Sequence, residues 1–205
     1  MSKLILDQRS IINRKKIATY ISSIAKENNL RTEASQKLVL KLISDEIKSG
    51  KQEIKRRFEK NQNGLHAANL NSFLIDQVLR TLYEIATLNI YRATNPTNSE
   101  KLALVAIGGF GRSELAPYSD IDLLFLHPYK LTFWCEQVIE YILYTLWDLG
   151  FKLGHSVRTV KDCIKISKDD IITKTSILES RYICGDRKLY NQLKDKYSKE
   201  IITNR

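Results

Sequence analysis

Residues 101–128 have the sequence KLALVAIGGFGRSELAPYSDIDLLFLHP, in which two apolar segments flank a glycine-rich stretch. The first apolar segment, residues 102–107, is short, unbroken and closed by glycine, which favours a buried strand over a helix. The second begins at Ile121 and is bounded by Pro128, so it also predicts a strand. A strand, a glycine turn, a loop and a second strand therefore form the centre of the predicted fold.

The glycine turn predicts an anion-binding loop. Gly108, Gly109 and Gly111 have no Cβ, so the backbone can adopt positive φ angles and approach a ligand closely. The N–H groups exposed in such a turn form a concave site for an anion such as phosphate. Arg112 and Ser113 follow directly and add a guanidinium and a hydroxyl group. A GGxG sequence on its own is more often only a tight turn.

Two carboxylates lie at the start of the second strand. Side chains alternate along a strand, so Asp120 and Asp122 are predicted to leave the same face. Two like charges this close are costly unless a cation lies between them, and carboxylate oxygens are the ligands that Mg²⁺ prefers. An Asp-x-Asp pair alone is more often a pair of solvated side chains. Beside a phosphate-binding turn, however, it predicts a metal-dependent nucleotidyl-transfer site.

The segments GGFGRSEL (108–115) and PYSDIDLLF (117–125) resemble the signature of the polymerase-β-type nucleotidyltransferase superfamily. More narrowly, the region from about 65 to 190 resembles the amino-terminal domain of the bacterial protein-PII uridylyltransferases. The other segments that carry this resemblance are LIDQVL (74–79), LWDLG (146–150), GHSVRT (154–159) and TSILESR (175–181).

The resemblance implies transfer of UMP from UTP to a tyrosine of the small regulatory protein PII, with release of pyrophosphate. It implies Mg²⁺, or Mn²⁺ in its place, held by Asp120 and Asp122, and it adds Ser119 to the nucleotide-binding residues. Arg158, on a later strand, is a candidate phosphate ligand. A surface salt bridge is an equally well supported role for that arginine.

The family pattern is incomplete in this chain. Members of the superfamily commonly use a third carboxylate on a later strand to take the proton of the attacking hydroxyl. Residues 153–159 contain none, and Asp162, Asp170 and Glu179 are the nearest acids. We prefer Glu179 for this role, with a surface position as the alternative. The phosphohydrolase and small-molecule-sensing domains of the long uridylyltransferases are not found, so uridylyl removal and glutamine sensing are not expected here.

Composition indicates one globular core, alone or with a helical extension, because the chain has 205 residues of which 43% are hydrophobic and 27% charged. The longest apolar runs are about six residues, too short to span a membrane, and the amino terminus does not have the pattern of a secretory signal. The three cysteines are far apart and predict neither a zinc site nor a disulfide framework. We therefore expect a cytoplasmic protein without a membrane partner.

The net charge of +10 raises the question of nucleic-acid binding. Residues 1–64 contain fifteen Lys and Arg against seven Asp and Glu, so most of the excess lies there. Glutamates are interleaved with the basic residues of the segment 51–60, and no aromatic platform accompanies them, which favours a solvated helix face. Nucleic acid is therefore not an expected partner.

We predict an α+β fold, with a helical amino-terminal region followed by a small mixed β-sheet and packed helices. The regions are a basic helical extension over 1–64, a nucleotidyltransferase core over 65–190 and a helical tail over 191–205. Hydrophobic periodicity within the core predicts helices at 66–93, 132–149 and 169–184 and strands at 102–108, 121–127 and 151–159.

Two alternatives to a PII-modifying enzyme remain open. The missing third acid and the missing domains suggest a relic that binds nucleotide or a partner without turnover. The basic amino-terminal region lends some support to a nucleotidyltransferase that acts on RNA or a small molecule.

Overall fold

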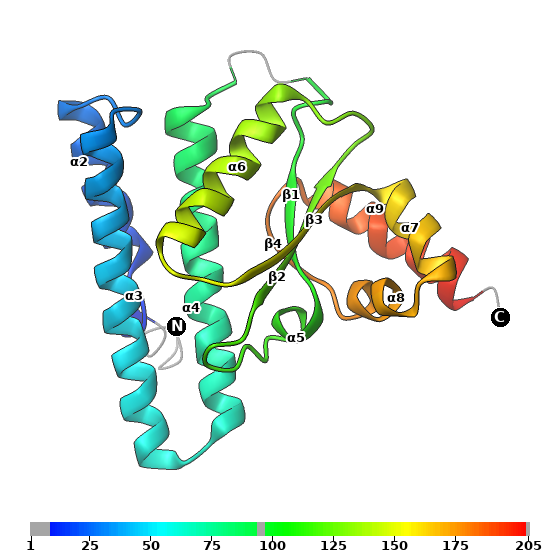
Figure 1. Cartoon of the computed structure of the whole chain (residues 1–205), viewed down its shortest axis with the longest axis horizontal. Coiled ribbons are helices and arrows are strands. Elements are labelled where there is room, and N and C mark those ends of the chain that lie inside the picture. The colour runs from blue at the N-terminus through cyan, green and yellow to red at the C-terminus, as the bar shows by residue number, and fades with distance from the viewer. Residues whose placement is uncertain (1–8, 94–96, 204–205) are drawn as a thin grey trace.

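The computed structural model describes residues 9–93 and 97–203. A four-stranded sheet with the order β3-β2-β1-β4 lies at its centre (Figure 1). β1 is antiparallel to both β2 and β4, whereas β2 and β3 are parallel. The strands are β1 (Ala103–Ala106), β2 (Ile121–His127), β3 (Leu153–Thr159) and β4 (Arg181–Gly185).

Helices cover both faces of this sheet (Figure 1). On the first face lie α2 (Arg14–Glu27), α3 (Glu33–Asn61), α4 (Gly64–Glu84) and α6 (Phe133–Asp148), with a π-helix, η1 (Ile85–Ile90), continuing α4. On the second face lie α7 (Val160–Asp169), α8 (Ile171–Leu178), α9 (Arg187–Tyr197) and η2 (Ser198–Ile202). No helix among residues 9–93 and 97–203 is both long and apolar enough to cross a membrane.

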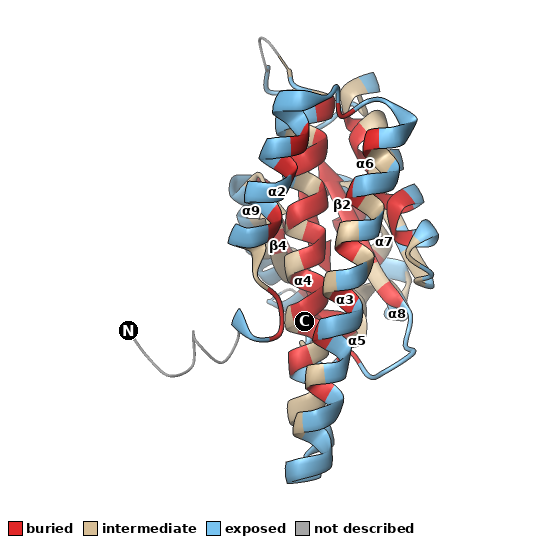
Figure 2. Cartoon of the chain, turned by 90° about the vertical axis from the view of Figure 1, so that its left-hand side faces the viewer, coloured by how far each residue is buried: buried red, intermediate tan, exposed pale blue. Residues whose placement is uncertain are grey.

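Alternation along the strands divides the buried side chains into two cores. In β1, Leu104 belongs to the core on the α4 and α6 side and Val105 to the core on the α7 and α9 side. Ile43 of α3 is buried in the first core. The helices of the basic amino-terminal region, α2 and α3, therefore pack against α4 (Figure 2). Tyr197 and Ile201 are buried in the second core, so the carboxyl-terminal helices also belong to the folded unit.

The structure confirms the predicted α+β class, with helices followed by a small mixed sheet. The predicted strand at 121–127 has the bounds of β2, and the predicted helix at 132–149 is α6. β1 ends at Ala106, earlier than the predicted strand at 102–108, because Gly108–Gly111 forms a single helical turn, α5.

The predicted helix over residues 169–184 is correct only for Ile171–Leu178, which form α8, and is wrong for its last part. Asp170 ends α7, and its carboxylate accepts hydrogen bonds from the N–H groups of Ile172 and Thr173, which starts α8 as a separate helix. Residues 181–185 then form β4, which pairs with β1. Apolar spacing in such short segments fits a helix or a strand, and pairing with a distant strand decides between them.

Candidate active site

The glycine turn and the acidic pair meet because β1 and β2 are antiparallel neighbours. The carboxyl end of β1 lies beside the amino end of β2, and the Ile107 N–H donates to the carbonyl of Asp122 at 3.1 Å. Gly108 begins the turn with a φ of 60°, a conformation that favours glycine. A Cβ at that position would lie 3.4 Å from Oδ2 of Asp122. The structure thus places Asp122 against the turn.

The carboxylates of Asp120 and Asp122 have no hydrogen-bond or ion-pair partner among the residues that the structure describes. Burial raises the pKa of Asp122, and the neighbouring negative charge of Asp120 raises this pKa further. Two adjacent carboxylates with unused oxygens are a suitable donor set for a hard divalent cation. The residues present therefore fit the magnesium ion that the family pattern implies.

Asp122 lies over a glycine of the neighbouring strand. In the parallel register Asp122 is paired with Gly154, so both residues face the side of the second core. A Cβ at residue 154 would lie only 2.2 Å from Oδ1 of Asp122. Gly154 therefore leaves the space that the carboxylate occupies, a role that the sequence did not indicate.

Polar side chains of α4 hold the turn and the loop that follows it. The Asn69 amide donates to the carbonyl of Ser113 at 2.7 Å, and the Asn71 amide donates to that of Leu115 at 3.0 Å. The hydroxyl of Ser72 accepts from the N–H of Leu115 at 2.9 Å. These residues were not predicted from the sequence. The signal that could have indicated them is a set of polar side chains within a helix of strong apolar periodicity.

Arg112, a predicted phosphate ligand, forms ion pairs with two carboxylates in this structure. Its Nε donates to Glu114 at 2.9 Å, and its Nη1 donates to Glu179 at 2.6 Å. Glu179 is thus beside the glycine turn, where its backbone carbonyl also packs against Gly111. Its carboxylate forms an ion pair with Arg112. Within residues 9–93 and 97–203, no three His, Cys, Asp or Glu side chains are placed to hold one metal ion.

The remaining predicted ligands are placed around this centre. Ser113 follows the turn with a φ of 63°, and Ser119 lies exposed in the loop before Asp120. Arg158 is paired in register with Leu126, so it faces the same side of the sheet as Asp122. It lies four residues beyond Gly154, which corresponds to roughly 13 Å along a strand. The sheet therefore places Arg158 on the correct face but away from the acidic pair.

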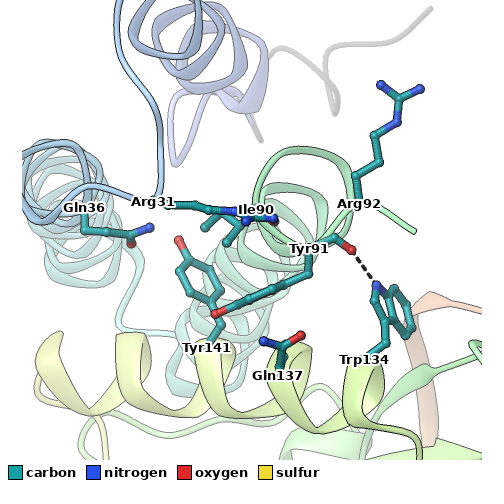
Figure 3. Close-up of a pocket in the computed structure, with 8 residues that line it drawn as sticks. All are labelled: Arg31, Gln36, Ile90, Tyr91, Arg92, Trp134, Gln137 and Tyr141. Carbon is teal, nitrogen blue, oxygen red and sulfur yellow. Dashed lines mark hydrogen bonds between the residues drawn. The ribbon is translucent and has the colours of Figure 1, made fainter. Parts of the chain in front are cut away.

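A cavity of about 510 Å³ lies elsewhere, between α3, α6 and the end of η1 (Figure 3). It is lined by Arg31, Gln36, Ile90, Tyr91, Arg92, Trp134, Gln137 and Tyr141. The Arg31 guanidinium donates to the carbonyl of Ile90, and the Trp134 indole donates to that of Tyr91. None of the predicted site residues lines this cavity, so the acidic pair and the glycine turn form a separate site.

Comparison with known proteins connects this site to a family. The chain is 43% identical over 192 residues to a bifunctional uridylyltransferase/uridylyl-removing enzyme of Phenylobacterium zucineum, covering 94% of this chain and 20% of that protein. It is 43% identical over 196 residues to the enzyme of that name in Azospirillum brasilense, covering 96% and 21%. The chain belongs to this family. The relative from Caulobacter vibrioides is 44% identical over 181 residues, 88% of this chain and 19% of the relative.

As a member of the bifunctional uridylyltransferase family, the chain spans about a fifth of the length of these relatives. The names of these relatives describe nucleotidyltransferases, because a uridylyltransferase is a nucleotidyltransferase. No protein-family model matches the chain.

Proposed function

We propose that the chain carries the nucleotidyl-transfer site of a uridylyltransferase and moves UMP from UTP to a tyrosine of the regulatory protein PII. The observation that carries this proposal is the unpartnered Asp120–Asp122 pair, of which Asp122 packs against Gly108 of the turn. A new bond would form between the tyrosine oxygen and the α-phosphorus. The bond from this phosphorus to the bridging oxygen would break, and pyrophosphate would leave.

The residues of the chain would act mainly by positioning and by charge complementarity. The first N–H groups of the turn after Ile107 have no partner within their own helix and can donate to phosphate oxygens. Asp120 and Asp122 would hold Mg²⁺, or Mn²⁺ in its place. Such an ion supplies neutralisation of the triphosphate and the leaving pyrophosphate when bound.

Exposure around the site supports a protein acceptor. Residues 116–120, which lead into the acidic pair, are all exposed. Helix α8, which ends beside the turn, exposes 71% of Ile171, 74% of Ile172 and 51% of Leu178. Exposed apolar side chains of this kind commonly mark a protein-binding surface. An open site with an apolar border suits a tyrosine presented by a folded partner.

A second candidate function is nucleotide binding without turnover. The surroundings of Glu179 favour this candidate. Glu179 is the acid predicted to take the proton of the attacking hydroxyl, and its carboxylate is held in an ion pair with Arg112. The described residues also provide no three-carboxylate cluster. In this case the chain would bind Mg²⁺ and UTP and would leave the acceptor unmodified.

Incubation with UTP labelled at the α-phosphate, Mg²⁺ and purified PII separates these functions. We expect the label on PII with UTP and much less with ATP, GTP or CTP. Binding of UTP without label transfer would favour the second candidate, and the absence of both would contradict the proposed function.

Replacing Gly154 by Ala tests the packing around Asp122. The backbone at Gly154 does not have a positive φ, so alanine fits the local conformation, but its Cβ would collide with the Asp122 carboxylate. We expect the affinity for Mg²⁺–UTP, measured by calorimetry, to fall by about 10- to 100-fold, the cost of a displaced catalytic group. The matched control is Gly64→Ala, where no atom lies within 4 Å of an added Cβ. Equal affinities in the two variants would contradict the role given to Gly154.

A further inference from the structure

An arginine of the edge strand β4 connects the glycine turn to the interior of the protein. Both Nη atoms of Arg181 donate to the carboxylate of Asp76 in α4, and the second of these contacts is 3.1 Å long. Nη2 also donates to the carbonyl of Phe110 at 3.0 Å, and Nε donates to that of Gly111 at 3.2 Å. The guanidinium carbon lies 5.3 Å from the centre of the Phe110 ring. One side chain thus contacts the two last residues of the turn and a helix on the first face of the sheet.

Arg181 donates to the last two carbonyls of the short helix that forms the turn. The last carbonyls of a helix accept no hydrogen bond from within the helix, and the helix dipole favours a cation near them. Phe110 and Gly111 end α5, and Arg181 donates to both of their carbonyls. The Phe110 carbonyl also accepts the N–H of Ser113 at 3.1 Å. A guanidinium has five donors in a fixed planar arrangement, so it can bind a carboxylate and two carbonyls together. Lysine cannot reproduce this geometry.

Stability alone does not explain a charged pair at this place. Asp76 is 8% exposed among mostly apolar buried residues of α4, and burial raises its pKa although Arg181 opposes the rise. Buried ion pairs contribute little net stability, and apolar residues of similar volume often replace them without loss. A fixed geometry is the other benefit that such a pair can provide. The groups that it fixes here are the carbonyls of the phosphate-binding turn.

We propose that Arg181 and Asp76 are positioning residues that act as one unit: Asp76 orients the guanidinium, and the guanidinium holds the Gly108–Gly111 turn in its anion-binding conformation. This inference rests on the proposed function, because the consequence for ligand binding requires that the turn binds nucleotide. Neither residue touches the proposed metal or phosphates. Their loss should therefore act through the order and direction of the turn.

The test compares Arg181→Lys with the wild type and with Arg187→Lys. Arg187 is a suitable control because its guanidinium also lies over an aromatic ring, that of Tyr182 at 4.7 Å, but it has no contact with the turn in the described residues. Lysine at 181 keeps the positive charge beside Asp76, so the fold is retained. Two quantities are measured: the Kd for Mg²⁺–UTP and the amide hydrogen exchange of residues 108–113 without ligand.

We expect Arg181→Lys to weaken the binding of Mg²⁺–UTP by about 10- to 100-fold and to speed exchange at residues 108–113, while α4 remains protected. Asp76→Asn should have the same effect, and the double variant should be no worse than the worse single variant, since coupled residues are not additive. Arg187→Lys should match the wild type in both measurements.

Wild-type affinity and wild-type exchange in Arg181→Lys would overturn the inference. So would a loss of protection spread equally over α4 and the turn, because this would indicate a merely structural role. If the wild-type chain itself fails to bind Mg²⁺–UTP, the proposed function fails instead. The exchange measurement would then still show whether Arg181 orders the turn.

Discussion

Replacing Asp122 by Asn should abolish nucleotidyl transfer while leaving the protein folded and slightly more stable. Asparagine keeps the shape of the side chain, but it removes a charge that would hold the divalent ion and that is repelled by Asp120. We expect a fall in the transfer rate on the order of 10³-fold or more, as for the loss of a principal electrostatic group. The melting temperature should rise by about 1 to 4 °C, since replacing a functional residue that destabilises the fold commonly stabilises the protein.

The pH dependence of stability provides an independent check of this variant. The pKa of Asp122 is raised in the folded protein, so the native state holds this proton to higher pH than the unfolded chain does. The protonated carboxyl of Asp122 makes its full contribution to the free energy of unfolding at acidic pH. This contribution is lost as the pH rises through the raised pKa, and it is absent at neutral pH. The difference in melting temperature between Asp122→Asn and the wild type should therefore grow from near zero at acidic pH to its full value at neutral pH. A constant difference, or appreciable transfer by the variant, would contradict the assignment.

Replacing Gly111 by Ala should produce a large loss of stability. An added Cβ would lie 2.3 Å from the carbonyl oxygen of Glu179 and 3.1 Å from that of Ala106. Both are backbone atoms, so no side-chain rotation relieves the collision, and the turn or the start of β4 must move. We expect a cost of about 2 to 4 kcal/mol and a melting temperature lower by roughly 5 to 15 °C.

Thermal unfolding of Gly111→Ala, measured beside Gly64→Ala, tests this expectation. Gly64 begins α4 and has open space where its Cβ would be, so alanine there should leave the melting temperature unchanged or slightly higher. If Gly111→Ala melted with the wild type, the close packing of the turn against Glu179 would not be present in solution.

The parts of the fold that sequence predicted well are those whose signals are local. β2 was found with its bounds because an acidic pair precedes an apolar run and Pro128 closes it. α6 was found because its apolar spacing ends at Gly150. β4 was missed because its partner β1 lies far away in the sequence, and the five residues 181–185 alone do not distinguish a strand from a helix turn.

The same distinction applies to the candidate site. Asp120, Asp122 and the glycines could be predicted because they lie in one short segment with a recognisable chemistry. The contact of Asp76 with Arg181 joins residues 105 positions apart, and that of Arg112 with Glu179 joins residues 67 apart. Such pairs depend on how the helices pack on the sheet. A lone acid in an apolar helix, as at Asp76, was the available hint, since buried carboxylates require a partner.

Paramagnetic relaxation measured with Mn²⁺ and UTP on the isotope-labelled chain tests the central claim most directly, because Mn²⁺ broadens amide signals only near its binding site. We predict broadening centred on residues 108–113, 120–122 and 154, and its loss when both Asp120 and Asp122 are replaced by Asn. Broadening centred elsewhere in the protein, or unchanged in the double variant, would contradict the account of this site.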